Sequence, residues 1–175
     1  NCVIQPPEIR HRVLFASEDL EVIEIGVPAE HITTIDHSMD LPTEHIRPDR
    51  LFEGQRFVHY KANETEWCPF RLPGFVARNT MICANTGAIA GVQVVKPGSD
   101  RPVWASHTSD IHFTFVLHGH LTLQSKDQAA QTLVAGDAFV TPPDMACLYS
   151  APSEDLELLE VSLPGEFETH LEDRA

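Results

Sequence analysis

The sequence predicts an all-β sandwich or barrel, and three observations support this fold class. Thirteen prolines and nine glycines divide the 175 residues into short runs rich in Val, Ile, Leu, Thr and Phe. These runs recur roughly every eight to twelve residues, which is the rhythm of a sandwich or barrel. No segment keeps the 3.6-residue apolar period of a long helix. Hydrophobic residues make up 42% of the chain, so it can bury a core.

The individual strands are expected where apolar or alternating runs lie between turn signals such as Lys96-Pro97-Gly98 and Ala135-Gly136-Asp137. The most readable runs cover residues 20–25, 91–95, 113–117, 121–124, 138–141 and 156–163. In the run at 113–117, alternation places His112 and Val116 on one face and the intervening phenylalanines on the other. One short helix is expected around residues 166–171, where acidic and apolar residues mix.

Charge and motifs exclude several functions. Acidic residues outnumber basic ones 26 to 12, which disfavours binding to a phosphate backbone. No run approaches the eighteen or so apolar residues that a membrane span needs. The sequence lacks the GxSxG, P-loop and GxGxxG motifs. The first residues do not resemble a signal peptide, and the four cysteines form no CxxC pair, so a cytoplasmic location is expected.

An internal repeat organises the chain. Residues 17–33 align without a gap on residues 153–169, at an offset of 136, and nine of the 17 positions are identical. The same offset pairs His11 with Cys147. We therefore expect residues 1–33 to be the last strands of a first domain, residues 34–50 to be a linker and residues 51–170 to be a complete second domain. A chance hairpin that resembles the C-terminal strands is the alternative.

Two motifs resemble those of the cupin superfamily. In the first, Lys96-Pro97-Gly98 is followed by Ala105-Ser106-His107, then by His112 after four residues and by Gly119 after six more. In the second, Gly136 is followed after five residues by Pro142, and then by Cys147. The resemblance implies a cupin double-stranded β-helix, or jelly-roll barrel, preceded by the C-terminal strands of another cupin barrel.

The resemblance also implies metal ligands, because cupins commonly use three His and one Glu. Here the four positions hold Ala105, His107, His112 and Cys147, so one ligand is lost and two are changed. His, His and Cys still suit a divalent transition metal, with Fe expected first and Zn, Mn, Ni or Cu as alternatives. His11 is the expected ligand of the first barrel, with its other ligands upstream. A pocket without metal is the other interpretation, with Cys147 as a core residue.

Further side chains are candidates for a substrate pocket. Tyr149 and Thr114 are expected on inward-facing strand positions, and Trp104 lies just before the first motif. Arg71, Arg78 and Arg101 are equal candidates for an anchor of a carboxylate, and the sequence does not distinguish among them. No catalytic residue can be assigned from the sequence.

Two functions follow from the resemblance. One is a two-barrel, metal-dependent oxidoreductase of the dioxygenase type that acts on a small organic acid or an aromatic compound. The other is a non-enzymatic cupin whose decayed site serves small-molecule binding, sensing or dimerisation. Either protein would be a homo-oligomer such as a dimer, or would associate with an upstream fragment of the same protein, and would bind neither nucleic acid nor membranes.

Overall fold

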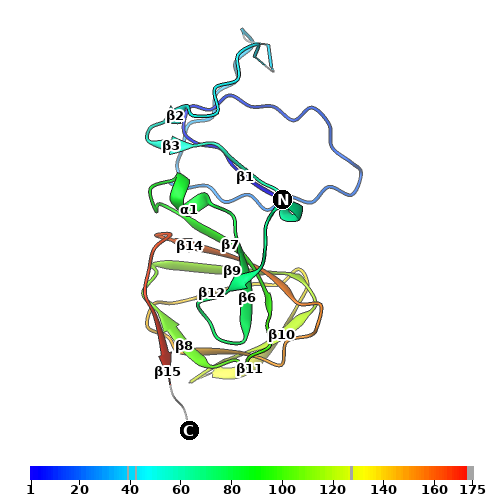
Figure 1. The fold of residues 1–175 in the computed structure, drawn as a ribbon, viewed down its shortest axis with the longest axis vertical. Coiled ribbons are helices and arrows are strands. Elements are labelled where there is room, and N and C mark those ends of the chain that lie inside the picture. The colour runs from blue at the N-terminus through cyan, green and yellow to red at the C-terminus, as the bar shows by residue number, and fades with distance from the viewer. Residues whose placement is uncertain (39, 42, 127, 173–175) are drawn as a thin grey trace.

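The protein forms a barrel of two antiparallel sheets that face each other (Figure 1). The computed structural model describes residues 1–38, 40–41, 43–126 and 128–172. One sheet has five strands in the order β11-β10-β13-β8-β15, and the other has six in the order β12-β9-β14-β7-β6-β5. Only about 4% of the chain is helical. The predicted all-β jelly-roll barrel is confirmed.

The five-stranded sheet is built from β8 (Trp104–His107), β10 (His120–Ser125), β11 (Gln128–Val134), β13 (Cys147–Ser150) and β15 (Thr169–Glu172). The six-stranded sheet is built from β5 (Cys68–Pro69), β6 (Phe75–Asn79), β7 (Gly91–Pro97), β9 (Ile111–His118), β12 (Ala138–Thr141) and β14 (Glu157–Leu163). Each predicted run from residue 91 onward therefore lies within or overlaps a strand of the barrel.

The strand β9 shows why the apolar and polar residues alternate. His112, Thr114 and Val116 are buried, whereas the side chains between them are only half-buried. Neighbouring side chains on a strand point to opposite faces, so this pattern places the first three inside the barrel. The face predicted from the sequence is confirmed, and it brings His112 into the interior.

The core lies between the sheets. Leu121, Leu158, Val95 and Val116 have no exposed surface. Tyr149 packs edge-on against Phe75 and Phe139, with ring centroids 6.1 and 5.6 Å apart. Because the polar pocket described below is continuous with this core, its side chains are held as firmly as the apolar ones.

The turn at Gly119 requires a glycine. It connects β9 to β10 with a φ of +69°, a conformation that glycine adopts without steric cost. A Cβ atom there would lie 2.8 Å from the backbone nitrogen of Leu156 and would also collide with the Ser153 hydroxyl. This glycine of the first motif therefore serves both the turn and the close approach of a neighbouring loop.

The helix predicted at residues 166–171 is wrong. Residues 169–172 instead form β15, which pairs with β8 and places Thr169 opposite His107. The acidic-apolar mixture suits an amphipathic helix, but pairing with the open edge of β8 supplies backbone hydrogen bonds that a single helical turn would lack. The chain therefore closes the sheet beside the pocket.

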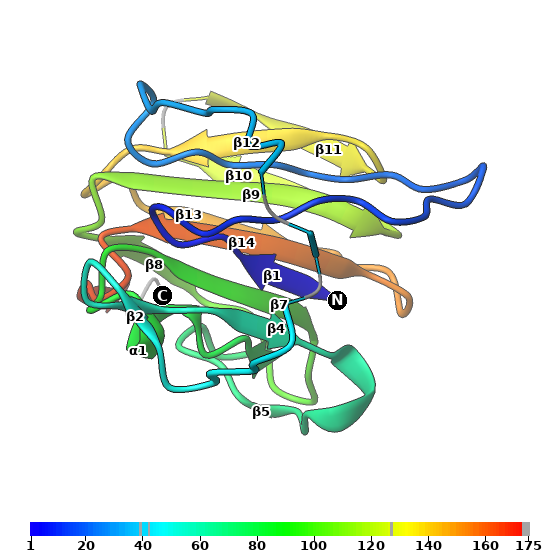
Figure 2. The same ribbon diagram turned by 90° about the horizontal axis from the view of Figure 1, so that it is seen from above.

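Residues 1–38, 40–41 and 43–50 lie outside the barrel, on the side of the six-stranded sheet (Figures 1 and 2). Their only strand within the described residues is β1 (Cys2–Ile4), which pairs with β4 (Val58–Tyr60). The strand predicted at residues 20–25 is wrong for this structure, because that run has no neighbouring strand to bond with. The proposed boundaries at residues 33 and 50 stay predictions.

Four short elements complete the structure: β2 (Leu51–Phe52), β3 (Gln55–Arg56), the 3₁₀ turn η1 (Ala62–Glu64) and α1 (Ile82–Asn85). None of the helices in the described residues is long and apolar enough to cross a membrane.

Candidate functional site

A small pocket lies between the two sheets. Strands β8 and β13 form one wall, β9 and β12 form the other, and the loop before β6 contributes a cation. The apolar lining residues are Leu72, Phe75, Val103, Ala105 and Met145, and the polar ones are Arg71, Ser106, His107, His112, Thr141, Cys147 and Tyr149. The free volume is about 20 Å³, which is room for about one water molecule.

The three residues predicted as metal ligands lie in this pocket. His107 ends β8, His112 lies at the second position of β9 and Cys147 begins β13. All three are buried, and the rings of His107 and His112 have centroids 4.6 Å apart. Cys147 is directly paired with Ala105, the position at which the superfamily has another His. The motif alignment therefore places equivalent positions on neighbouring strands.

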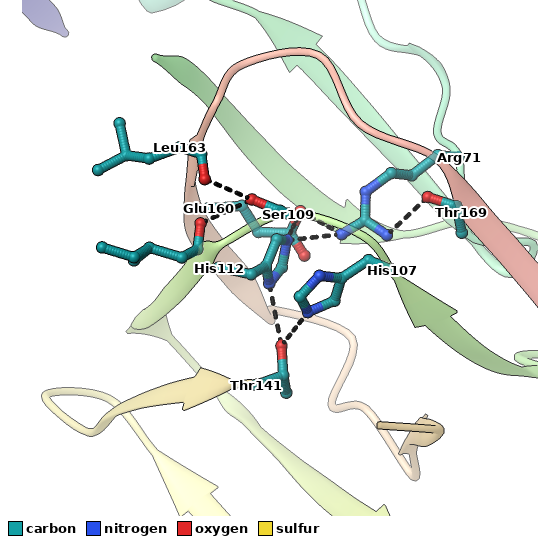
Figure 3. Close-up of polar contacts among 9 residues, drawn as sticks. Arg71, His107, Ser109, His112, Thr141, Glu160, Leu163 and Thr169 are labelled. Atoms are coloured by element: carbon teal, nitrogen blue, oxygen red, sulfur yellow. Dashed lines mark hydrogen bonds and ion pairs between the residues drawn. The ribbon is translucent and has the colours of Figure 1, made fainter. Parts of the chain in front are cut away.

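Arg71 is the cation of the pocket (Figure 3). Its Nη2 atom lies 2.8 Å from His112 Nε2 and 3.0 Å from Glu160 Oε2, and Nη1 lies 3.4 Å from the Thr169 hydroxyl. An arginine side chain can only donate hydrogen bonds. In this contact His112 Nε2 therefore accepts from Arg71 and the ring carries its proton on Nδ1, while Glu160 Oε2 lies 3.5 Å from the same Nε2.

Glu160 balances the charge of Arg71. It lies on the inner face of β14, and its side chain is 5% exposed. Burial by itself raises the pKa of this carboxyl, but the Arg71 guanidinium outweighs it and the pKa is lowered to about 2. Glu160 is thus an ionised carboxylate at neutral pH, and its Oε1 atom has no hydrogen-bond partner among the described residues.

A directional chain of hydrogen bonds links the two histidines through Thr141 (Figure 3). His112 Nδ1 lies 3.2 Å from the Thr141 hydroxyl, which lies 2.9 Å from His107 Nε2. Since His112 Nδ1 carries the proton, the hydroxyl accepts from His112 and donates to His107 Nε2. The proton of a neutral His107 must then be on Nδ1, and this buried atom has no partner within the described part of the chain.

His107 stays neutral over most of the pH range. Burial is the main cause, with the neighbouring His112 and Arg71 adding to it, and together they lower the pKa of His107 to about 4. The imidazole therefore presents an unpartnered N–H donor inside a buried pocket. Such a donor costs free energy unless a water or ligand oxygen accepts its hydrogen bond.

Phe167 covers the polar side chains from the loop between β14 and β15. Its ring lies edge-on to His107 and His112, with centroid separations of 6.0 and 5.8 Å. The guanidinium carbon of Arg71 lies 5.1 Å from the Phe167 ring centre and 4.8 Å from that of Phe70. Two aromatic rings therefore hold the cation where it meets the histidines.

These side chains do not fit a divalent metal ion. A metal would need the lone pair that His112 Nε2 gives to Arg71, while His112 Nδ1 is protonated and His107 Nε2 is bonded to Thr141. Burial raises the pKa of Cys147 to about 11, so its sulfur is a protonated thiol rather than the thiolate that binds metals. Within the described residues, no group of three or more His, Cys, Asp or Glu side chains is arranged to hold a metal.

Of the other residues predicted for a pocket or a metal site, only Tyr149 lines this pocket. Tyr149 lines the pocket, and burial is the main cause that raises the pKa of its hydroxyl. Thr114 is fully buried on β9, but it lies two residues beyond His112 and is not among the lining residues. Trp104 is at the start of β8 and is also outside the lining. His11 is exposed in the N-terminal segment, so it does not join this pocket.

Sequence reasoning missed Glu160, Thr141 and Phe167. A signal for Glu160 was present, since a glutamate at an inward position of an otherwise apolar strand needs a buried cation. Thr141 and Phe167 carried no such signal, because their roles depend on which strands become neighbours. Arg71 was one of three candidate anchors, and only the structure distinguishes it from Arg78 and Arg101.

The fold and the pocket define a small jelly-roll barrel with an internal polar site. The sequence profile of the family described as Cupin domain matches residues 91–162. The resemblance to cupins that the motifs predicted is confirmed for residues 91–162. No curated protein matches its sequence.

Two solved structures share this fold at low sequence identity. The polyketide cyclase RemF from Streptomyces resistomycificus is 17% identical with a TM-score of 0.54, over 67% of this chain and 86% of that one. A variant of PAC13 from Streptomyces, with uridine, is 15% identical with a TM-score of 0.52, over 66% of this chain and 90% of that one.

Proposed function

We propose that this cupin barrel binds a small organic acid, with the carboxylate held by Arg71 and His107. The observation that carries the proposal is the unpartnered, buried Nδ1 atom of His107 in a pocket that also contains the Arg71 guanidinium. A carboxylate oxygen is an acceptor for both kinds of donor, and guanidinium groups bind carboxylates with good geometry. Apolar side chains, among them Leu72, Phe75 and Met145, also line the pocket and suit the carbon skeleton of such an acid.

The size of the pocket limits the ligand. Room for about one water molecule is enough for one carboxylate oxygen but not for a whole acid. The oxygen would replace that water, and the carbon skeleton would lie toward Arg71, whose side chain is 21% exposed. Movement of Phe167 would make this room, because its ring lies on the histidines and the guanidinium.

The charge balance sets the expected affinity. Glu160 already neutralises Arg71, so an incoming anion gains less than it would at an unpaired arginine. The guanidinium has five N–H donors; Nη2 donates to His112 and Glu160 and Nη1 to Thr169, which leaves two donors for a ligand. Binding therefore depends on hydrogen bonds to a correctly placed oxygen more than on net charge, and amides of the same shape should bind more weakly but detectably.

A metal-independent enzyme is the second candidate function. Donors aimed at a developing negative charge can stabilise an enolate or alkoxide, and Arg71 and His107 form such a pair. The pKa values of His107 and Glu160, about 4 and about 2, make both weak bases at neutral pH, so the pocket favours polarising a carbonyl over abstracting a proton. The name polyketide cyclase, given to one protein of the same fold, is compatible with this candidate.

The metal-dependent dioxygenase implied by the superfamily is the least supported candidate. It would require Arg71 to leave His112 Nε2 before a metal could bind, and Arg71 is held by Glu160 and two aromatic rings. We therefore derive no step through a metal.

Nitrogen-15 NMR of the histidine side chains tests the proposal directly. Titration with acetate, pyruvate and benzoate should shift the His107 Nδ1–H resonance in a saturable manner, and benzamide should shift it less. Arg71→Gln should weaken binding of the acids at least tenfold. Arg56→Gln is the matched control, because Arg56 forms an exposed pair with Asp49 and does not line the pocket. No saturable shift with any acid, or equal binding by the Arg71 variant, would overturn the proposal.

A further inference from the structure

The sequence repeat extends to the backbone of its turns. Residue Glu8 has a φ of +60°, and Asp144, 136 positions later, has a φ of +63°. In both copies the residue after it donates a backbone hydrogen bond to the first proline of the turn: Ile9 to Pro6 at 3.2 Å and Met145 to Pro142 at 3.4 Å. Non-glycine residues seldom adopt a positive φ, so its recurrence at this offset indicates the same kind of turn.

The second turn of the repeat also has the same backbone hydrogen bond in both copies. The backbone nitrogen of Leu20 donates to the Ser17 carbonyl at 3.3 Å, and that of Leu156 donates to the Ser153 carbonyl at 3.1 Å. Both turns of the repeat thus lie at the same spacing in residues 1–33 as in residues 137–169. In the second copy they connect β12, β13 and β14 of the barrel.

The strands between these turns are unpaired in the first copy. The counterpart of β14 is residues 21–27, which form no strand, and its apolar side chains are 39–72% exposed. Because the alignment has no gap, the side chains alternate along the segment in the same way in both copies. Ile23 and Val27 correspond to the half-buried Leu159 and Leu163, Ile25 corresponds to the buried Val161, and Glu24 corresponds to Glu160, which is buried in the pocket.

The barrel of this chain cannot accept residues 21–27. In the six-stranded sheet β14 lies between β7 and β9, and both of those strands are already bonded to it along their length. A second set of strands with the pattern of β7–β10 is needed to pair with residues 1–33. A second folded copy of the chain offers no such strands, because its β7 and β9 are already paired with its own β14.

We propose that residues 1–33 close a second jelly-roll barrel, and that Glu24 is a pocket residue of that barrel. The missing strands come from another stretch of polypeptide with the pattern of β7–β10. Glu24 faces a cationic group there, as Glu160 faces Arg71 here. His11, the counterpart of Cys147, lines the same pocket. This inference is independent of the ligand proposed above.

A graft within the full chain tests the equivalence of the two segments. Residues 153–169 are replaced by the sequence of residues 17–33, which places Glu24 at the position of Glu160. The graft should give a β-rich circular dichroism spectrum and a cooperative unfolding transition; because it replaces Phe167, which contacts His112, with His31, the His112 Nδ1–H resonance is compared with the parent in the shorter graft below, which keeps Phe167. Failure of this graft to fold would overturn the proposal unless a shorter graft, of residues 21–27 in place of Glu157–Leu163, folds with the same resonance.

A register-shifted graft is the matched control. Residues 16–32 placed at the same site have nearly the same composition but turn Glu24 outward and an isoleucine inward, since a shift of one residue exchanges the faces of a strand. This variant should not fold cooperatively. In the in-register graft, replacing the Glu24 equivalent with Gln should lower the unfolding midpoint as far as Glu160→Gln does in the parent. Equal behaviour of the shifted and in-register grafts would contradict the role of Glu24.

Discussion

Arg71 and Glu160 lie 89 residues apart in the sequence and form an ion pair inside the barrel, with Nη2 and Oε2 separated by 3.0 Å. The two side chains differ in burial, since that of Arg71 is 21% exposed and that of Glu160 is 5% exposed. Solvent can therefore compensate an unpaired Arg71 more easily than an unpaired Glu160. The pair should respond unequally to the loss of either partner.

Arg71→Met should lower the free energy of unfolding by about 3 kcal/mol at pH 7, because it leaves a buried carboxylate without its cation. Glu160→Gln should cost less, about 1–2 kcal/mol, because the guanidinium keeps some contact with water. Urea denaturation of both variants measures the difference. Arg56→Met, which breaks an exposed pair, should cost no more than about 1 kcal/mol. A larger loss for Glu160→Gln than for Arg71→Met would contradict this order.

Stability should fall as the pH decreases from about 6.5 to 4. The unfolded His107 takes up a proton near pH 6.5, whereas the folded one does so only near 4, so the unfolded state binds more protons in this window. The contribution is about 3 kcal/mol at most. His107→Gln should flatten the pH profile of urea denaturation in this range, and His118→Gln, at an exposed residue, should not. Parallel profiles for the parent and His107→Gln would show that this shift is absent.

Glu160 should affect the stability of the fold at a lower pH than His107 does. Its pKa is lowered in the folded state, so its contribution is complete above about pH 4.5 and is lost as the pH falls toward 2. The loss of stability in Arg71→Met should therefore shrink below about pH 4, because the unpaired carboxyl becomes neutral. Chemical denaturation of the two proteins at pH 3 and pH 7 gives the comparison. A loss that is the same at both values would contradict the assignment of the charge to Glu160.

Removal of Arg71 should make the pocket more receptive to metal. In Arg71→Ala the Nε2 lone pair of His112 and the Glu160 carboxylate are both released, and two imidazoles with a carboxylate are a common ligand set for transition metals. Titration with Co²⁺, followed by its visible absorption bands, should show at least tenfold tighter binding by the variant. Equally tight binding by the parent would mean that Arg71 does not obstruct the site.

Gly119→Ala should destabilise the barrel more than Gly136→Ala. Both glycines have a positive φ, +69° and +94°, so both substitutions share the backbone cost of roughly 1 kcal/mol. Only at Gly119 would the new methyl group meet the loop at Ser153 and Leu156; at Gly136 no atom lies within 4 Å. Thermal unfolding of the two variants isolates the effect of this contact, and equal midpoints would show that the loop moves aside.

The sequence predicts the barrel well because its strands have clear signals of their own. The inward alternation of His112 and Val116, and the turns at Gly119 and Gly136, are local properties of short segments. The helix expected at 166–171 failed because β15 exists only through its pairing with β8. The strand at 20–25 failed because its pattern needs a neighbour that this chain does not offer.

The candidate site could be predicted only in part. Motif spacing brought His107, His112 and Cys147 to one pocket, since it depends on strand positions that the fold preserves. Spacing does not show that Arg71, from a loop 41 residues before His112, occupies its Nε2 atom. That contact, rather than the identity of the histidines, changes the chemistry from metal binding toward hydrogen bonding.

The position of Glu160 on β14 has a consequence for the dynamics of the pocket. Because β14 is bonded to strands on both sides, its amide hydrogens should exchange with solvent only through global unfolding, and the carboxylate should move as little as the core. Phe167 follows this strand in the loop before β15. If a ligand enters by movement of Phe167, as proposed above, the rate of entry would depend on this loop, whereas the strength of binding would depend on the charges held by β14.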